Sequence, residues 1–290
     1  MKIKSNLYEP YLNKSDNFFV KNCINDGWVS TAGKNIDKFE KKISSFVKSK
    51  YCLALNSGTS ALDLSLKVLG VNSSHTILVP TATFVAPINA ILYNNAEPIF
   101  IDVDENLNIN ISDVIRYLKN ETTRKKGSLI SKNNKKIIKA IIIVHVFGKP
   151  ADILDLIKIC KIYNIKIIED ASESLGSYYI KKKNKFHTGT IGDLGCLSFN
   201  GNKIITTGSG GMLMTNNKKY FTKAKYLASQ SKNNSIYFVH DNVGYNLRMN
   251  NLSASLGLSQ LKKINYILFK KKRDYELYEK LINKENFELM

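Results

Sequence analysis

Arginine is scarce in this chain of 290 residues: only four of its 43 basic residues are arginine, at positions 116, 124, 248 and 273. The formal net charge of +19 at pH 7 is of the kind that attracts nucleic acid. A dedicated nucleic-acid binder, however, enriches arginine, which reads phosphates and guanine edges through paired hydrogen bonds. Lysine, asparagine and isoleucine share A/T-rich codons, so a codon bias of the genome explains the lysine excess. The composition therefore predicts solvated lysine faces and argues against a nucleic-acid partner.

The chain also has few cysteines and no long apolar run. Its four cysteines, at positions 23, 52, 160 and 196, show no CxxC pairing, and three of them lie in apolar runs. That pattern predicts reduced, packed thiols. Residues 1–6 lack an apolar signal core, and no uninterrupted run approaches the roughly 20 residues of a membrane span. The expected location is the cytoplasm, without a membrane partner.

Short β-branched runs alternate with longer amphipathic stretches between positions 50 and 215. The runs predict seven strands, at residues 52–56, 76–80, 98–103, 140–146, 166–170, 196–199 and 211–215. The stretches predict helices at residues 35–48, 59–69, 86–93, 111–118, 153–163, 219–230 and 252–272. Apolar strands separated by amphipathic helices are typical of a mostly parallel sheet covered on both faces. The expected fold is α/β, a three-layer sandwich around a mostly parallel seven-stranded sheet.

Polar and small residues follow several of these strands. They lie at residues 56–60, 81–84 and 198–203 and at Asp170. Ligands of open parallel sheets collect at the carboxyl ends of the strands. We therefore expect these segments, although far apart in sequence, to meet along one edge of the sheet.

An amine, a carboxylate and a hydroxyl stand out in this set. Lys203 lies among Asn, Ile and Thr rather than in a charged run, Ser198 precedes it, and Asp170 ends the apolar run of residues 166–170. These groups suit pyridoxal phosphate: the amine forms the Schiff base, the acid pairs with the pyridine nitrogen and the hydroxyl meets the phosphate. Each also has an ordinary interpretation, since Lys203 could extend to solvent from a strand end and Asp170 could cap a helix.

Two weaker signals fit the same site. Gly58, Thr59 and Ser60 open a predicted helix directly after a strand, where backbone N–H groups at the positive helix end can hold a phosphate. The alternative is an ordinary capped helix. Phe84 lies just beyond another strand, where it could stack on a planar ring or simply join the core. Metal ligation is not predicted, because His145 and His187 show no ligand spacing with any acid.

Four longer sequence segments resemble those of a known protein family. They lie at residues 27–34 (GWVSTAGK), 169–176 (EDASESLG), 197–208 (LSFNGNKIITTG) and 238–241 (FVHD). With them the chain resembles the DegT-type nucleotide-sugar aminotransferases, pyridoxal-phosphate enzymes of aspartate-aminotransferase fold (fold type I), and within them the LegC-type branch. The likeness runs from about residue 27 to residue 261.

The resemblance implies a role for each site residue. Lys203 would form the internal aldimine and shuttle the proton, Asp170 would pair with the ring nitrogen, and Phe84 would stack on the ring. Ser198 and the turn at residues 58–60 would hold the phosphate. Glu173 would lie near the ring hydroxyl. Asn246 would reach the phosphate of the neighbouring subunit's cofactor, which implies a homodimer with shared active sites.

The implied reaction is two half-transaminations. Glutamate would donate the amino group, and a nucleotide-linked 4-keto-6-deoxy sugar, 2-acetamido and bound to UDP or GDP, would accept it on the way to bacillosamine- or legionaminic-type surface glycans. A perosamine-type or 3-keto substrate and a non-catalytic remnant remain alternatives. The related sugar dehydratases carry His at the lysine position, so Lys203 argues against them.

The resemblance also suggests how the chain is divided. Residues 1–250 would form the cofactor-binding large domain with an N-terminal arm, and residues 251–290 would be bridging helices at the start of a truncated C-terminal domain. Within the large domain, residues 122–136 are polar and basic and predict a surface excursion, and residues 181–185 predict a hairpin tip.

Overall fold

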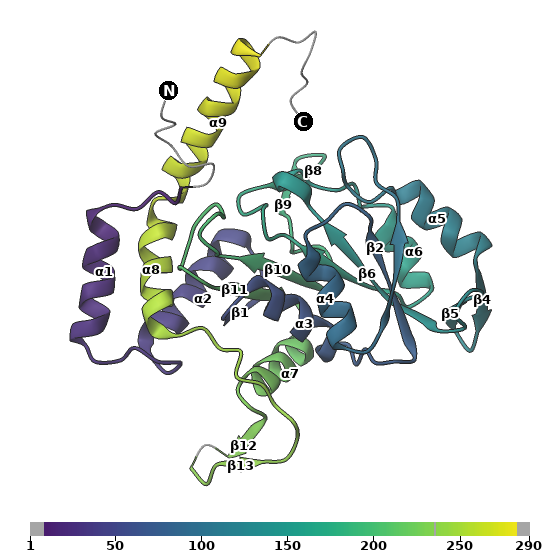
Figure 1. Ribbon diagram of the computed structural model, residues 1–290, viewed down its shortest axis with the longest axis horizontal. Helices are drawn as coiled ribbons and strands as arrows, with labels where there is room; N and C mark the ends of the chain where they lie inside the picture. Colours follow the sequence, from purple (N-terminus) through teal and green to yellow (C-terminus); the bar gives the residue numbers. More distant parts are fainter. Residues whose placement is uncertain (1–8, 235, 283–290) are drawn as a thin grey trace.

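A nine-stranded mixed sheet organises the computed structural model, which describes residues 9–234 and 236–282 (Figure 1). Seven strands lie in the order β1-β11-β10-β7-β6-β2-β3. Their bounds are β1 (Tyr51–Leu55), β2 (His75–Pro80), β3 (Glu97–Ile101), β6 (Ile137–Val144), β7 (Lys166–Asp170), β10 (Leu194–Ser198) and β11 (Gly211–Thr215). Only β11 runs against the others along this path. The predicted α/β fold with a mostly parallel sheet is confirmed, and the seven predicted strands form this path within the nine-stranded sheet.

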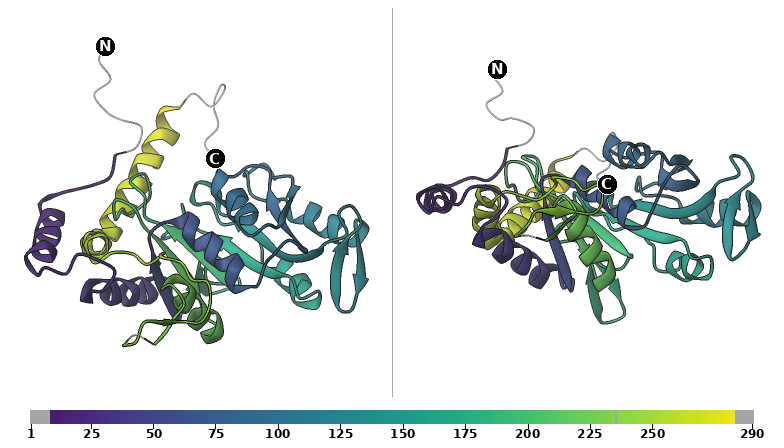
Figure 2. Two further views of the ribbon diagram at one scale, coloured as in Figure 1. Left: turned by 60° about the horizontal axis from the view of Figure 1, so that its bottom comes forward. Right: turned by 90° about the horizontal axis from the view of Figure 1, so that it is seen from below.

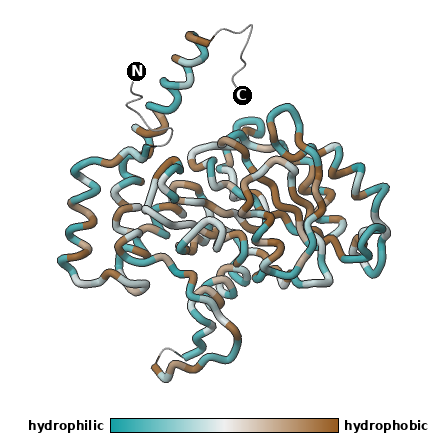
Figure 3. The backbone as a smooth tube through the Cα atoms, viewed as in Figure 1, coloured by the Kyte–Doolittle hydropathy of each residue, from teal (hydrophilic) through white to brown (hydrophobic). Residues whose placement is uncertain are grey.

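Helices cover both faces of the sheet. One face carries α3 (Gly58–Val68), α4 (Val85–Tyr93) and α7 (Lys218–Ala228). The other carries α2 (Lys34–Val47), α5 (Ile111–Asn120), α6 (Leu156–Ile162) and α8 (Asn251–Lys262). Because strand residues alternate between faces, Leu53 and Leu55 pack under the first set while Cys52 and Ala54 pack under the second. Apolar residues accordingly concentrate in the central strands (Figure 3).

Two helices at the ends of the described chain differ from expectation. The predicted helix at residues 252–272 is divided into α8 and α9 (Ile264–Leu281) by Lys263, whose φ of −98° and ψ of 1° leave the helical region. Beyond that break α9 projects from the body (Figures 1 and 2). Helix α1 (Lys14–Asn25), which the apolar pattern did not reveal, packs against α8, and Asp16 pairs with Lys263 at 2.6 Å. Residues 283–290 of the expected C-terminal segment lie outside the described residues.

Three hairpins extend the sandwich. The expected surface excursion contains β4 (Thr122–Lys125) and β5 (Ser128–Ser131), and β5 joins the sheet through β6. The predicted hairpin tip at residues 181–185 connects β8 (Tyr178–Lys181) and β9 (Asn184–His187). A third hairpin, β12 (Lys232–Asn234) and β13 (Val239–His240), projects below α7 in Figure 1. No helix within residues 9–234 and 236–282 has the length and apolar character needed to cross a membrane.

Candidate active site

The carboxyl ends of the parallel strands gather the candidate residues along one edge of the sheet. Asp170 ends β7, Ser198 ends β10, and Lys203 lies in the turn between β10 and β11, where its amide donates to Asn200 O at 3.1 Å. Gly58 follows β1 and Phe84 follows β2. This arrangement arises because parallel strands end on the same side of a sheet.

A cavity of about 790 Å³ lies at this edge. Seven of the predicted site residues line it: Gly58, Thr59, Phe84, Asp170, Glu173, Ser198 and Lys203. A cavity of this size accommodates a small organic cofactor or ligand. The structure therefore brings together side chains that are up to 145 positions apart in the sequence (203 − 58).

Lys203 supplies the amine of the cavity. Its side chain is 16% exposed, and Nζ lies 3.0 Å from Glu173 Oε1. The other oxygen of that carboxylate, Oε2, accepts a hydrogen bond from the Phe147 amide at 3.1 Å. Glu173 thus joins the lysine to the short turn η1 (Val146–Gly148).

Asp170 supplies a buried carboxyl group. It is 5% exposed, and its Oδ1 accepts from the Ser172 amide at 3.1 Å. Burial raises the pKa of Asp170, and the hydrogen bonds from Ser172 together with the charges of Lys203 and His145 only partly oppose that rise. A cation bound against Asp170 would stabilise its ionised form.

The amino terminus of α3 also lines the cavity. Ser57 caps this helix: its Oγ accepts from the Ser60 amide at 3.0 Å, and its carbonyl accepts from the Ala61 amide at 3.2 Å. The amides of Gly58 and Thr59 precede the first helical carbonyl partners and are left for a ligand. Ser60 was predicted to share in phosphate binding. Its amide instead donates to the Ser57 cap, and its hydroxyl donates to Asn56 Oδ1 at 2.6 Å. It does not line the cavity.

Gly58 permits the close approach of this helix to β10. A Cβ at Gly58 would lie 2.8 Å from Ser198 Cβ and 3.2 Å from Ser198 Oγ. Any larger residue would therefore push the Ser198 hydroxyl away from the helix terminus. The two amides and this hydroxyl form a compact group of donors.

Residues of the second strand end complete the wall. Phe84 is 77% exposed although it lines the cavity, so its ring is not part of the core. Thr83 Oγ1, also at the cavity, is buried without a hydrogen-bond partner among the described residues. A buried hydroxyl of this kind is costly unless a ligand or water meets it.

A buried network behind the cavity was missed by sequence reasoning. Glu169, wholly buried beside Asp170, accepts hydrogen bonds from His145 Nε2 at 3.0 Å and Tyr179 OH at 3.0 Å. Burial opposes the charge of Glu169, but the hydrogen bonds from His145, Gly192 and Gly189 outweigh it and hold its pKa below the ordinary value. The only sequence signal was that His145 follows one strand of the sheet and Glu169 lies in the next.

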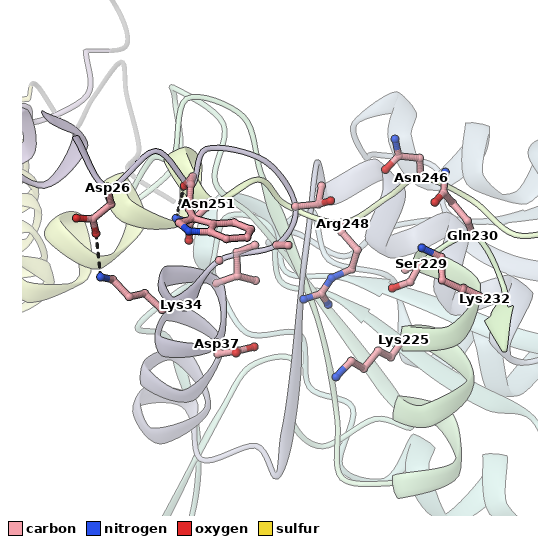
Figure 4. Close-up of a pocket in the computed structure, with 16 residues that line it drawn as sticks. Asp26, Lys34, Asp37, Lys225, Ser229, Gln230, Lys232, Asn246, Arg248 and Asn251 are labelled. Carbon is pink, nitrogen blue, oxygen red and sulfur yellow. Dashed lines mark hydrogen bonds and ion pairs between the residues drawn. The ribbon is translucent and has the colours of Figure 1, made fainter. Parts of the chain in front are cut away.

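Asn246 lies in a different cavity, also of about 790 Å³ (Figure 4). Trp28, Lys34 and Lys225 line it as well. Arg248 enters it from the strand edge: Nη2 pairs with Glu40 Oε1 at 2.9 Å, and Nη1 is buried without a partner among the described residues. Asn246 is therefore separate from the other predicted site residues within one copy of the chain.

Comparison with known proteins decides the family. The sequence profile of the DegT/DnrJ/EryC1/StrS aminotransferase family matches residues 10–289. The chain belongs to this family. It is 36% identical over 278 residues to the GDP-perosamine synthase of Escherichia coli O157:H7, covering 96% of this chain and 71% of that protein. It is 33% identical over 262 residues to a UDP-4-amino-4,6-dideoxy-N-acetyl-beta-L-altrosamine transaminase of Campylobacter jejuni serotype O:23/36, covering 89% and 65%.

Solved structures show the same fold in family members. Helicobacter pylori PseC, an aminotransferase involved in the biosynthesis of pseudoaminic acid, superposes with a TM-score of 0.83 at 27% identity, covering 96% of this chain and 71% of that chain. An aminotransferase from Psychrobacter cryohalolentis gives a TM-score of 0.76 at 27% identity, covering 89% and 63%. This chain thus spans from just under two thirds to about seven tenths of the length of these relatives.

Proposed function

We propose that this chain is a pyridoxal-phosphate-dependent aminotransferase that transfers an amino group from glutamate to a nucleotide-linked keto sugar. One observation carries the proposal: the Lys203 amine, the buried Asp170 carboxyl and the amino terminus of α3 line one cavity. A covalent anchor, a partner for a cationic ring and a phosphate cradle are the three requirements of this cofactor.

The residues present fit pyridoxal phosphate. The N–H groups of Gly58 and Thr59 and the Ser198 hydroxyl supply donors for a phosphate, and the absence of a Cβ at Gly58 keeps them together. The unpartnered Thr83 hydroxyl gives the cavity a further polar group to satisfy. Asp170, whose pKa is raised by burial, gains a stabilising cation in a protonated pyridine nitrogen.

The bound cofactor would supply an electron sink for the carbon that gains or loses the amino group. Lys203 Nζ would anchor it and would carry the proton at the reacting carbon. Asp170 would keep the ring nitrogen charged, and Phe84, exposed at the cavity wall, would offer its ring for stacking on the cofactor. Gly58, Thr59 and Ser198 would hold the phosphate end.

The relatives direct the choice of sugar. The altrosamine transaminase carries 4-amino-4,6-dideoxy and N-acetyl in its name, and the GDP-perosamine synthase names a GDP-linked sugar. We therefore propose a 4-keto-6-deoxy hexose on UDP or GDP, 2-acetamido in the UDP case, as the acceptor for surface-glycan synthesis. The GDP-linked, perosamine-type form of this acceptor is supported by the 36% identical synthase, and the UDP-linked form by the 33% identical transaminase.

We further propose a homodimer with shared sites. Asn246 lies outside the cavity of Lys203 and lines a second one in which Arg248 Nη1 has no partner among the described residues. The Asn246 amide lines that second cavity, and an amide N–H suits an anion such as a phosphate. Supplied by a second copy, Asn246 would contribute to the partner's cofactor phosphate.

Absorbance spectroscopy tests the cofactor. The purified chain, incubated with pyridoxal phosphate and passed over a desalting column, is expected to keep visible absorbance, and borohydride reduction is expected to fix a pyridoxyl group on Lys203 by peptide mass. Lys203→Ala should lose both signals, whereas Lys158→Ala, an exposed lysine with a 75% exposed side chain, should keep them. Equal absorbance in the Lys203→Ala variant would contradict the proposal.

Substrate trials test the reaction. With glutamate and UDP- or GDP-linked 4-keto-6-deoxy sugars, the chain should form 2-oxoglutarate and an amino sugar. Cofactor binding without turnover on any keto sugar would favour the non-catalytic alternative. Turnover with only the GDP-linked sugar would establish the perosamine-type activity.

A further inference from the structure

Glu173 holds Lys203 by one oxygen and a backbone turn by the other. Oε1 lies 3.0 Å from Lys203 Nζ, and Oε2 accepts from the Phe147 amide at 3.1 Å. Phe147 adopts a left-handed conformation, with φ of 50°, and the next residue, Gly148, has φ of 85°. A Cβ at Gly148 would lie 3.0 Å from Glu173 O. The turn is therefore packed directly on the residue that carries the carboxylate.

Other charged or titratable groups around the amine hold it less directly. Asp170, on β7, interacts with Lys203 through its charge, and its oxygen is hydrogen-bonded to the Ser172 amide. His145 turns Nε2 to Glu169, which is wholly buried and in turn holds the backbone of residues 189, 191 and 192. Within the described residues, Glu173 is thus the carboxylate in direct contact with Lys203 Nζ.

We propose that Glu173 is a latch for the Lys203 ammonium, which holds the amine in place inside the cavity whenever the lysine is not covalently engaged. The role of the latch rests on the proposed function, in which Lys203 alternates between a bound and a released state. An ammonium has no lone pair, so Nζ must give a proton to water and leave Glu173 before it can attack any carbonyl carbon. The ion pair therefore slows the first attachment and stabilises the proton-carrying lysine after release.

The direction in which the reactivity of the Lys203 amine should change follows from electrostatics. The amine must leave the carboxylate before its nitrogen can react, so removing the negative charge of Glu173 makes the Lys203 amine more reactive at neutral pH. The side chain of Glu173 is 40% exposed, and solvent weakens the pair. We expect a change of roughly threefold to fivefold in amine reactivity, in line with partly exposed ion pairs.

Trace reductive methylation measures the reactivity without the cofactor. The cofactor-free chain is treated with limiting formaldehyde and cyanoborohydride, in which the neutral amine condenses with the aldehyde, water leaves and hydride reduces the product. Peptide mass spectrometry reports labelling at Lys203 relative to exposed Lys158. At pH 7.5, Glu173→Gln should raise this ratio roughly threefold to fivefold. Glutamine retains an oxygen for the Phe147 amide.

Two comparisons separate charge from access. Glu276→Gln, which removes an exposed carboxylate on α9, should leave the ratio unchanged. Raising the salt concentration from about 0.05 M to about 1 M should shrink the difference between wild type and Glu173→Gln, because salt screens the partly exposed ion pair; a steric effect would persist. Equal labelling at pH 7.5, or a difference that does not fall with salt, overturns the latch. Failure to bind pyridoxal phosphate with the labelling result intact would overturn the proposed function and leave the ion-pair latch supported.

Discussion

His145 Nε2 lies 3.0 Å from Glu169 Oε2, and the opposite ring nitrogen, Nδ1, accepts from the Ala151 amide at 3.2 Å. Because Nδ1 is an acceptor, the ring proton is on Nε2, which donates to Glu169. The main-chain N–H of His145 also donates to Asp170 O at 3.1 Å. Glu169 thus fixes the orientation of the His145 ring. The backbone of His145 in turn holds Asp170, the proposed partner of the cofactor's ring nitrogen.

Replacing Glu169 by Gln is expected to destabilise the fold. The carboxylate accepts from His145 Nε2, Tyr179 OH and the amides of Gly189, Ile191 and Gly192. A carboxamide would turn its own N–H groups toward some of these donors and leave them unsatisfied. We expect Glu169→Gln to lower the free energy of unfolding by about 3 kcal/mol, measured by urea denaturation, with Glu276→Gln as the unaffected control.

The same residue predicts a pH dependence. Its pKa is lower in the folded than in the unfolded chain, so its stabilisation is complete above the unfolded value and is lost as the pH falls through the folded value. Wild-type stability should therefore decline in acid below the ordinary carboxyl pKa of 4.5, with a shallower decline in Glu169→Gln. Parallel acid curves for the two proteins would contradict this assignment.

The pKa of Asp170 is shifted in the opposite direction to that of Glu169. Burial raises its pKa, so its contribution to stability is lost as the pH rises through the folded value. In the cofactor-free chain at neutral pH, Asp170→Asn is expected to unfold at a higher urea concentration than wild type. The same variant should bind pyridoxal phosphate more than about tenfold more weakly, because the ring nitrogen loses its anionic partner. Loss of stability together with retained affinity would refute both parts.

The position of the candidate site was predictable because its residues follow strands that the sequence itself marks. Lys203, Asp170 and Ser198 each come at or just after an apolar β-branched run, and a parallel sheet places such ends together. Ser60 shows the limit of that reasoning. The sequence indicates a donor-rich helix start, but the Ser57 cap decides which amides remain.

Features made by distant contacts were not predictable. Glu169 looked like one more residue of a strand, since its partners are 10 to 24 positions away. Helix α1 is stabilised by α8, more than 230 positions later, through hydrogen bonds such as Ser255 Oγ to Phe19 O at 2.6 Å. Its local signal was the pair Asn13 and Asp16, which form a capping box at the helix start. The apolar pattern of α1 alone was too weak to reveal it.

The lack of space for a side chain at Gly58 leads to a prediction that can be tested with a matched control at Gly201. A methyl group at Gly58 would lie 2.8 Å from Ser198 Cβ, so α3 and β10 must separate. We expect Gly58→Ala to cost about 1–3 kcal/mol of stability and to weaken capture of pyridoxal phosphate. Gly201→Ala, in the turn that carries Lys203, meets no atom within 4 Å and should preserve both properties. Comparable losses in the two variants would show that space at Gly58 is not the cause.

The ion pair of Glu40 and Arg248 is expected to stabilise the fold. Their side chains are 14% and 12% exposed, and Glu40 Oε1 accepts from both Arg248 Nη2 at 2.9 Å and the Ala54 amide at 2.8 Å. Burial raises the pKa of Glu40, and Arg248 works against that rise. Removing the guanidinium leaves a buried carboxylate without its cation, so Arg248→Ala should cost about 3 kcal/mol, whereas Arg273→Ala on exposed α9 should cost little.

The pH dependence of that loss identifies its origin. A carboxyl whose folded pKa is raised destabilises the fold as the pH rises through that value, and without Arg248 the rise is larger. The deficit of Arg248→Ala relative to wild type should therefore grow between pH 5 and pH 8 in urea denaturation. Relative to Glu40→Gln, which likewise has no carboxylate at this position to ionise, the double variant Arg248→Ala/Glu40→Gln should show a deficit that is independent of pH. A deficit that is the same at both pH values in the single variant would mean that lost packing, rather than the uncompensated charge of Glu40, causes the destabilisation.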